Sequence, residues 1–182
     1  MTDGSGDATA GSGGFADVWT AITSRRDVRQ FDSRPISGAD LDRILEAGRR
    51  SPSSNNWQPW DFVVVTDRQQ LAELANVWRG AGHVARSAAT VALITSTGDL
   101  EKARLDLGQA MMSIMLAAAG LGIGSGHSAV GDQQLARQLL GFPEDRTCAF
   151  LIPLGYPAGR PLRPIREPNR RPFDEVVHAG RW

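Results

Sequence analysis

Several residue types are scarce in this chain of 182 residues. It has one cysteine, Cys148, which excludes an intramolecular disulfide and cannot build a thiolate metal site alone. Because Cys148 stands in the apolar run 148–152, we interpret it as a buried core thiol and not as a nucleophile. The three histidines, His83, His127 and His178, show no metal-ligand spacing. We therefore predict no metal site.

The chain also lacks net charge and long apolar runs. Twenty basic residues balance twenty acidic ones, so nucleic acid is not an expected partner. No apolar stretch is long enough to span a membrane, and residues 1–14 contain no apolar signal-peptide core. We expect a cytoplasmic protein that does not bind membranes. The composition of residues 1–14 predicts a disordered leader, and residues 15–182 are expected to form one domain.

Hydrophobic periodicity predicts helices that alternate with strands, which indicates an α/β or α+β layered domain. The first helix is expected from Phe15 to near Ser24. A second should begin after a capping pair at Ser37 and Asp40, and a third after a capping Asp67. Two further helices are expected over residues 101–119 and over Gln133–Leu140. Buried strands are expected over Phe62–Thr66, Thr90–Thr95 and Ala149–Leu154. The segment 79–87 is expected to be a loop. The helix over 101–119 is apolar on most of its surface and should therefore be central and buried.

Two short segments carry the strongest chemical signal. Residues 24–31 place Arg25, Arg26 and Arg29 just after the first predicted helix, and guanidinium groups suit phosphate. Residues 51–60 form a turn of hydroxyl and amide side chains that runs into a strand, and such groups can bind a planar polar ring. Together they predict a site for a phosphorylated ligand with a hydrogen-bonding ring. Taken alone, the arginines would be interpreted as a solvated helix end, and the turn and the second arginine cluster over 160–171 weaken that interpretation.

A run of alternating glycines follows the long helix, at positions 120, 122, 124 and 126. It is not a dinucleotide fingerprint, because that motif follows a strand and opens a helix. The run either lets backbone pass close to a flat ligand or simply turns the chain. His127 after it either lines a pocket or is a structural histidine.

The segment from Pro157 onward is rich in proline and arginine and becomes apolar near its end, at Phe173, Val176 and Trp182. It is too apolar there to be free chain in solvent. It either packs on a second subunit or wraps its own core, and the pattern favours neither.

At these residues the chain resembles the FMN-dependent nitroreductase family, over roughly residues 18–182. The resemblance lies in motifs that occur in the family's order: Arg25–Phe31, Pro52–Trp60, Gly120–Gly122, Leu154–Pro157 and Arg170–Val177. Asp27 stands where many relatives have serine. The resemblance implies an α+β, three-layer fold with a central mixed, largely antiparallel sheet flanked by helices. It also implies a homodimer with exchanged terminal segments and two FMN sites at the subunit interface.

The resemblance further implies the residues of the cofactor site. Those carried over by motif to the FMN phosphate and ribityl chain are Arg25, Arg26 and Arg29, joined by Arg170 or Arg171. Asp27 is also expected at the cofactor site, where it either pairs with these arginines or accepts a hydrogen bond from the ligand. Those expected to approach the flavin from the partner subunit are Pro52, Ser53, Ser54, Asn56 and, as a weaker candidate, Gln58. The segment His127, Ser128, Ala129 and Val130 is expected along the ring, with backbone N–H groups near the reactive nitrogen. No residue is identified as a catalytic acid or base.

The implied activity is an NAD(P)H-dependent FMN oxidoreductase that reduces nitroaromatic, quinone or related acceptors by a ping-pong mechanism. FMN would carry the chemistry while the protein positions it. Two alternatives stay open. One is a flavin-cleaving enzyme similar to 5,6-dimethylbenzimidazole synthases, which share the Arg25–Arg29 pattern and a serine near Ser128. The other is a flavin-binding protein without turnover.

Overall fold

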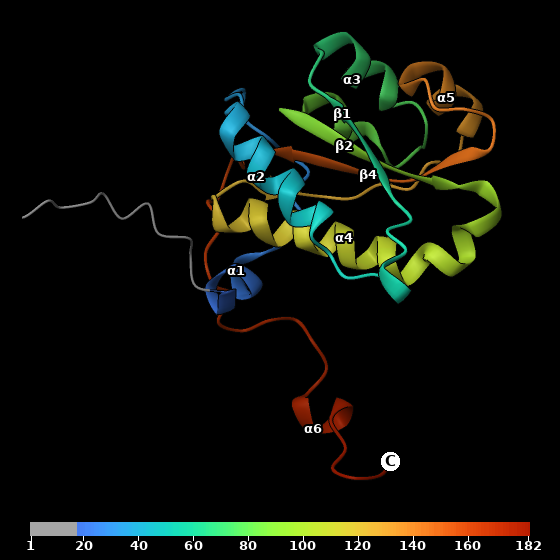
Figure 1. The fold of residues 1–182 in the computed structure, drawn as a ribbon. Coiled ribbons are helices and arrows are strands. Elements are labelled where there is room, and N and C mark those ends of the chain that lie inside the picture. Colours follow the sequence, from blue (N-terminus) through green and yellow to red (C-terminus); the bar gives the residue numbers. More distant parts are fainter. Residues whose placement is uncertain (1–17) are drawn as a thin grey trace, which may run out of the picture.

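A four-stranded sheet lies between two layers of helices in the computed structural model (Figure 1). The structure describes residues 18–182, so the predicted leader and Phe15 lie outside the described residues. Helices α2 (Gly38–Arg49) and α4 (Leu100–Gly120) cover one face of the sheet. Helices α3 (Arg68–Leu74) and α5 (Gln133–Leu140) cover the other. This is the three-layer α+β arrangement that the sequence predicts.

The strands run in the order β1-β2-β4-β3, and every neighbouring pair is antiparallel. They are β1 (Asp61–Val65), β2 (Ala89–Ser96), β3 (Gly124–Ser125) and β4 (Arg146–Gly155). Alternate residues of β2 enter opposite layers: Leu93 packs with α4, whereas Ala92 and Ile94 pack with α3 and α5. The three predicted strands are confirmed, while β3 was not predicted. A parallel bridge between Asp27 and Ser125 makes the sheet mixed at this edge.

Local capping determines where the predicted helices begin and end. The Ser37 hydroxyl accepts the Asp40 N–H at the start of α2, and the Asp67 carboxylate accepts the Gln70 N–H at the start of α3. Gly141 ends α5 in the left-handed region, at a φ of 74°. The expected loop over 79–87 instead contains a short 3₁₀ helix, η2 (Gly82–Arg86), which buries Val84.

The long helix α4 is central, as predicted. Its buried residues include Leu107, Ile114 and Met115, which pack on β2, β4 and α2. The expectation fails for Leu105, which is 70% exposed. Cys148 is buried on the opposite face of the sheet, and this burial raises the pKa of its thiol to about 12. The interpretation of Cys148 as a core thiol is therefore confirmed.

The C-terminal segment leaves its own domain after Ile165. Up to that point it runs beside residues 23–31, since the Ala158 N–H donates to the Gln30 carbonyl and the Ile165 N–H donates to the Thr23 carbonyl. The last helix, α6 (Phe173–Val176), stands apart from the sheet and its helices (Figure 1). Trp182 is 98% exposed. Of the two interpretations of this segment, wrapping its own core is wrong beyond Ile165.

No helix in the described part of the chain is long and apolar enough to cross a membrane.

Candidate functional site

The first arginine motif lies along the edge of the sheet beside β3. Helix α1 (Val18–Ser24) ends immediately before it, and the Arg25 N–H still donates to the Ala21 carbonyl. The chain then extends, and Val28 N–H donates to the Ser125 carbonyl at 2.8 Å. The motif and the end of the glycine run therefore lie side by side.

Two glycines permit this close approach. A Cβ on Gly126 would lie 2.8 Å from the Val28 carbonyl oxygen, and one on Gly124 would lie 2.7 Å from a Val28 methyl group. Backbone at position 28 could not approach any residue with a side chain so closely. The glycines at 124 and 126 thus admit the chain's own arginine motif, which neither interpretation of the glycine run foresaw, and approach of a flat ligand to the run stays a prediction.

Asp27 links an arginine to a histidine at this edge. Its Oδ1 lies 3.0 Å from Arg25 Nη1, and its Oδ2 lies 3.7 Å from His127 Nδ1. Arg25 also lies against α4, with Nη1 3.7 Å from Met115 Sδ. The carboxylate thus restrains the Arg25 guanidinium, while about half of the His127 side chain faces solvent.

His83 belongs to the same site, although the sequence analysis did not single it out. Its Nε2 is buried without a hydrogen-bond partner among the described residues, and it lies 3.4 Å from the Cβ position of Gly126. Burial, followed by the nearby charge of Arg29, lowers the pKa of the imidazole, while a hydrogen bond to the Gly80 backbone opposes this. A neutral ring that bonds Gly80 through Nδ1 presents Nε2 as an acceptor.

Arg26 and Arg29 line a cleft of about 430 Å³ together with Arg160. Arg26 donates hydrogen bonds to the Pro161 and Arg160 carbonyls, and burial together with the Arg160 charge lowers its pKa. Arg160 was not a predicted site residue. Arg170 and Arg171 were predicted site residues, but they lie on the α6 segment, where Arg171 pairs with Glu175. Within one chain the structure does not bring them to the cleft.

The second motif is anchored to α4 by a buried carboxylate. It contains the short 3₁₀ helix η1 (Ser54–Asn56), and both the N–H and the hydroxyl of Ser54 donate to Asp106, at 3.2 and 3.4 Å. Asp106 is 1% exposed. Ser53 Oγ accepts the Gln58 N–H at 2.8 Å, and Gln58 Nε2 donates to the Asn56 carbonyl. Pro52, like Asn56 and Gln58, is exposed.

Positive φ angles at Asn55, Asn56 and Gln58 give this turn its shape. Asparagine tolerates the left-handed region better than most residues, which explains the amides in the motif.

The two motifs contact α4 at separate points. Ser54 bonds to Asp106 and Arg25 lies on Met115, positions that are about 13 Å apart at 1.5 Å of rise per residue. Within one chain the two motifs line separate clefts: Arg26 and Arg29 line one, and Ser54 and Asn55 line another. The surface of α1 and α4 carries exposed apolar side chains: Val18, Trp19, Ile22, Leu105 and Met112.

The segment His127–Val130 is only partly available to a ligand. Ser128 is 4% exposed, and its N–H donates to the Leu151 carbonyl, so that backbone donor is already used. Val130 packs against the core on the α5 side of the sheet. His127 and Ala129 are the exposed members.

Comparison with known proteins identifies the family. The model of the nitroreductase family matches residues 22–93 and 74–156. A protein of Archaeoglobus fulgidus named as an NADH dehydrogenase/NAD(P)H nitroreductase is 31% identical over 170 residues, which cover 88% of this chain and 96% of the relative.

Two solved structures share the fold. An FMN-dependent nitroreductase of Clostridium difficile superposes with a TM-score of 0.80 at 21% identity, over 89% of this chain and 98% of that one. An NADPH:FMN oxidoreductase of Vibrio harveyi, complexed with NAD⁺, superposes with a TM-score of 0.75 at 24% identity, over 89% of this chain and 76% of that one. The predicted fold and the resemblance to the family are thereby confirmed, and the chain belongs to the nitroreductase family.

Proposed function

We propose that this protein is an oxidoreductase that binds FMN, takes hydride from NADH or NADPH, and reduces a nitroaromatic, quinone or related acceptor. Membership of the nitroreductase family supports the reaction class. The names of two structures with the same fold, an FMN-dependent nitroreductase and an NADPH:FMN oxidoreductase, support the cofactor and the donor. The observation that carries the proposal is the convergence of Arg25–Arg29, Gly126 and His83, with an unpaired imidazole nitrogen, at one edge of the sheet.

The residues at this edge fit FMN. Arg26, Arg29 and Arg160 line one cleft and offer guanidinium donors of the kind that bind phosphate. A buried polar atom without a partner is costly, and His83 Nε2 is such an atom among the described residues. As a neutral acceptor it suits the ring N–H of a flavin. We assign the phosphate and ribityl chain to Arg25, Arg26 and Arg29, and a polar edge of the ring to His83.

The chain's own groups would position the cofactor. When bound, FMN supplies the hydride-transfer chemistry between the nicotinamide and the acceptor. Asp27 pairs with Arg25 and faces His127, which orients the Arg25 guanidinium, while Arg26 and Arg29 form no ion pair with any described residue and supply the positive charge of the site. A fixed positive charge stabilises negative charge that develops during reduction. Donor and acceptor would occupy the same place in turn, as a ping-pong sequence requires.

We propose that a second copy of the chain completes each site. The turn that holds Ser53, Ser54 and Asn56 lines a different cleft from Arg26 and Arg29 of the same chain, so these residues would serve the site of the other copy. The exposed apolar residues of α1 and α4 lie on the surface that would join the two copies. The α6 segment, with Arg170 and Arg171, would reach the other copy in the same way. Pro52 and Gln58 belong to this contribution. Of the segment expected along the ring within each chain, His127 and Ala129 are exposed and would meet the flavin, whereas Ser128 and Val130 are packed and would support them. The cytoplasmic location stays a prediction.

A visible absorption spectrum tests the proposal. Protein loaded with FMN should show flavin absorption that NADH or NADPH bleaches and a nitroaromatic or quinone restores. Replacing Arg29 by Ala should weaken FMN binding at least about tenfold, since a charge-assisted phosphate contact is lost. Arg104→Ala, which removes an exposed guanidinium paired with Glu101, is the charge-matched control.

Other outcomes distinguish the alternatives. Failure of the protein to take up FMN would remove the proposal as a whole. Bound flavin that no nicotinamide bleaches would identify a non-catalytic flavin protein. Oxygen-dependent destruction of the flavin in the presence of a reductant would identify the flavin-cleaving enzyme.

A further inference from the structure

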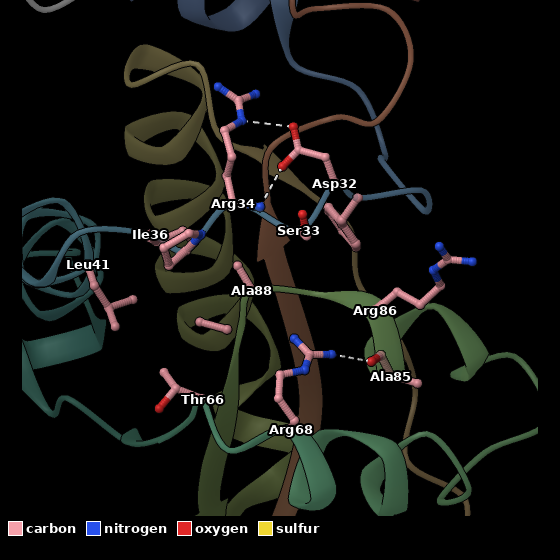
Figure 2. Close-up of a pocket in the computed structure, with 13 residues that line it drawn as sticks. Asp32, Ser33, Arg34, Ile36, Leu41, Thr66, Arg68, Ala85, Arg86 and Ala88 are labelled. Carbon is pink, nitrogen blue, oxygen red and sulfur yellow. Dashed lines mark hydrogen bonds and ion pairs between the residues drawn. The ribbon is translucent and has the colours of Figure 1, made fainter.

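A second basic hollow lies beside residues 31–36, the chain that follows the arginine motif. It has a volume of about 430 Å³, within the range of about 300–1,000 Å³ that small-molecule sites occupy. We call it the basic pocket. Its lining includes Arg34, Arg68 and Arg86 together with the apolar residues Phe31, Leu41 and Ala89 (Figure 2). It shares no lining residue with the cleft at Arg26, Arg29 and Arg160.

Positive charge exceeds negative charge in this pocket. Asp32 is the one carboxylate among the described lining residues, and it is taken by Arg34, whose backbone N–H and Nε both donate to it at 2.9 and 2.8 Å. Arg68 and Arg86 form no ion pair with any described residue. Two guanidinium charges are therefore left without a carboxylate partner.

Arg68 is held in place without being neutralised. Its two terminal nitrogens donate to the backbone carbonyls of Ser87 and Ala85, as Figure 2 shows in part. Carbonyl groups orient the guanidinium but carry no formal charge, and donors remain, because a guanidinium has five N–H groups. The side chain of Arg86, at the end of η2, makes no hydrogen bond with any described residue. One arginine is thus preorganised, and another can move to meet a ligand.

The inner wall of the pocket is apolar. Phe31 and Ala89 in the lining are 3% and 1% exposed and therefore offer little surface, whereas Ile36, Leu41 and Ala88 are half-buried and present the apolar surface that a ligand can cover. A hydrated inorganic ion would leave this wall in contact with water. A ligand that carries an apolar group would cover it, at a gain of about 25 cal/mol for each Å² removed from water.

We propose that the basic pocket binds a small organic anion, in which a phosphate monoester or carboxylate is attached to an apolar group. The oxyanion meets Arg68 and Arg86, and the apolar group lies against Ile36, Leu41 and Ala88. This site goes beyond the proposed oxidoreductase activity, because it needs neither flavin nor nicotinamide.

The test is calorimetric titration of the full-length protein saturated with FMN, so that the flavin phosphate site is already filled. The probes are phenyl phosphate, benzoate, inorganic phosphate and benzylammonium. Phenyl phosphate or benzoate should bind saturably, and whichever binds more tightly identifies the oxyanion. Inorganic phosphate should bind at least about tenfold more weakly than phenyl phosphate, and benzylammonium should not bind. Failure to take up FMN would affect the proposed function alone, since the same titration can be repeated without flavin.

Variants locate the binding site. Arg86→Ala should weaken binding of the preferred anion at least about tenfold, and Arg86→Glu should abolish it. Neither substitution removes a hydrogen bond made in the folded chain, so both variants should fold. Arg104→Ala, with the same loss of charge outside the pocket, should bind as the wild type does. Equal affinity of the Arg86 and Arg104 variants would overturn the proposal. So would the absence of saturable binding to the wild type, as expected if a second copy of the chain closes the pocket.

Discussion

At the scale of single residues, His83 makes the stability of the fold depend on pH. Its pKa is lowered by burial and by Arg29, so protons bind the unfolded chain more readily than the folded one. The stabilisation is therefore fully present above the unfolded pKa of about 6.5 and falls as the pH drops below it. We expect the urea midpoint to decrease between pH 7.5 and pH 5.5.

The contribution of His83 is isolated by substitution. His83→Asn keeps a short hydrogen-bonding group near Gly80 but cannot be protonated, so its urea midpoint should change less over the same pH range. His178→Asn, at an exposed histidine of the C-terminal segment, should follow the wild-type curve. Identical pH dependence in all three proteins would contradict the assignment.

Gly126 is a second residue whose effect can be predicted. A Cβ there would meet the Val28 carbonyl oxygen at 2.8 Å, and backbone cannot move aside as a side-chain end can. Gly126→Ala should lower the free energy of unfolding by about 1–3 kcal/mol, typical of overpacking, and should weaken FMN binding because the arginine motif shifts. Gly38→Ala, where nothing lies within 4 Å, is the matched control and should change stability by less than about 0.5 kcal/mol.

At the scale of elements, the shape of η1 depends on a buried carboxylate of another helix. Asp106→Ala would leave the Ser54 N–H and hydroxyl without their acceptor. We expect a loss of about 1–3 kcal/mol in unfolding free energy, and faster proteolytic cleavage between Ser53 and Gln58. Glu101→Ala removes an exposed carboxylate from the same helix, and it should change neither the unfolding free energy nor the rate of cleavage. Unchanged cleavage in Asp106→Ala would show that the turn holds its shape alone.

Most elements were predictable because their signals are local. Ser37 and Asp67 cap the helices that follow them, and the apolar runs over Phe62–Thr66 and Thr90–Thr95 are long enough to identify strands. The strand β3 was not predictable, because Gly124–Ser125 has no apolar pattern and pairs only because β4 and Val28 flank it. The 3₁₀ helix η2 was missed for a similar reason, since its one fully buried apolar residue, Val84, gives no periodicity.

The residues of the candidate site were predictable only where they belong to a sequence motif. The Arg25–Arg29 and Pro52–Trp60 segments were found, but His83 and Asp106 were not, because their roles depend on contacts across the fold with Gly126 and Ser54. Sequence periodicity also could not show that Leu105 faces outward. An apolar residue that meets solvent in one chain has the same pattern as one that meets the core.

At the scale of the whole molecule, the exposed apolar surface of α1 and α4 predicts association. Leu105→Lys places a charge where we propose that two copies meet, so the protein should become monomeric in sedimentation equilibrium and should bind FMN more weakly. Gln138→Lys adds the same charge at an exposed position of α5 and should leave association unchanged. A Leu105→Lys protein that stays dimeric would place the interface elsewhere.

The separation of Arg25 and Ser54 along α4 has a genetic consequence. If each site takes its arginines from one chain and its turn from the other, two differently damaged chains can repair each other. Arg29→Ala and Asp106→Ala proteins, each defective alone, should regain activity when unfolded and refolded together. Random pairing places half of the chains in mixed dimers with one intact site of two, so about a quarter of the wild-type sites should return. A protein whose sites were built within single chains would show no such rescue.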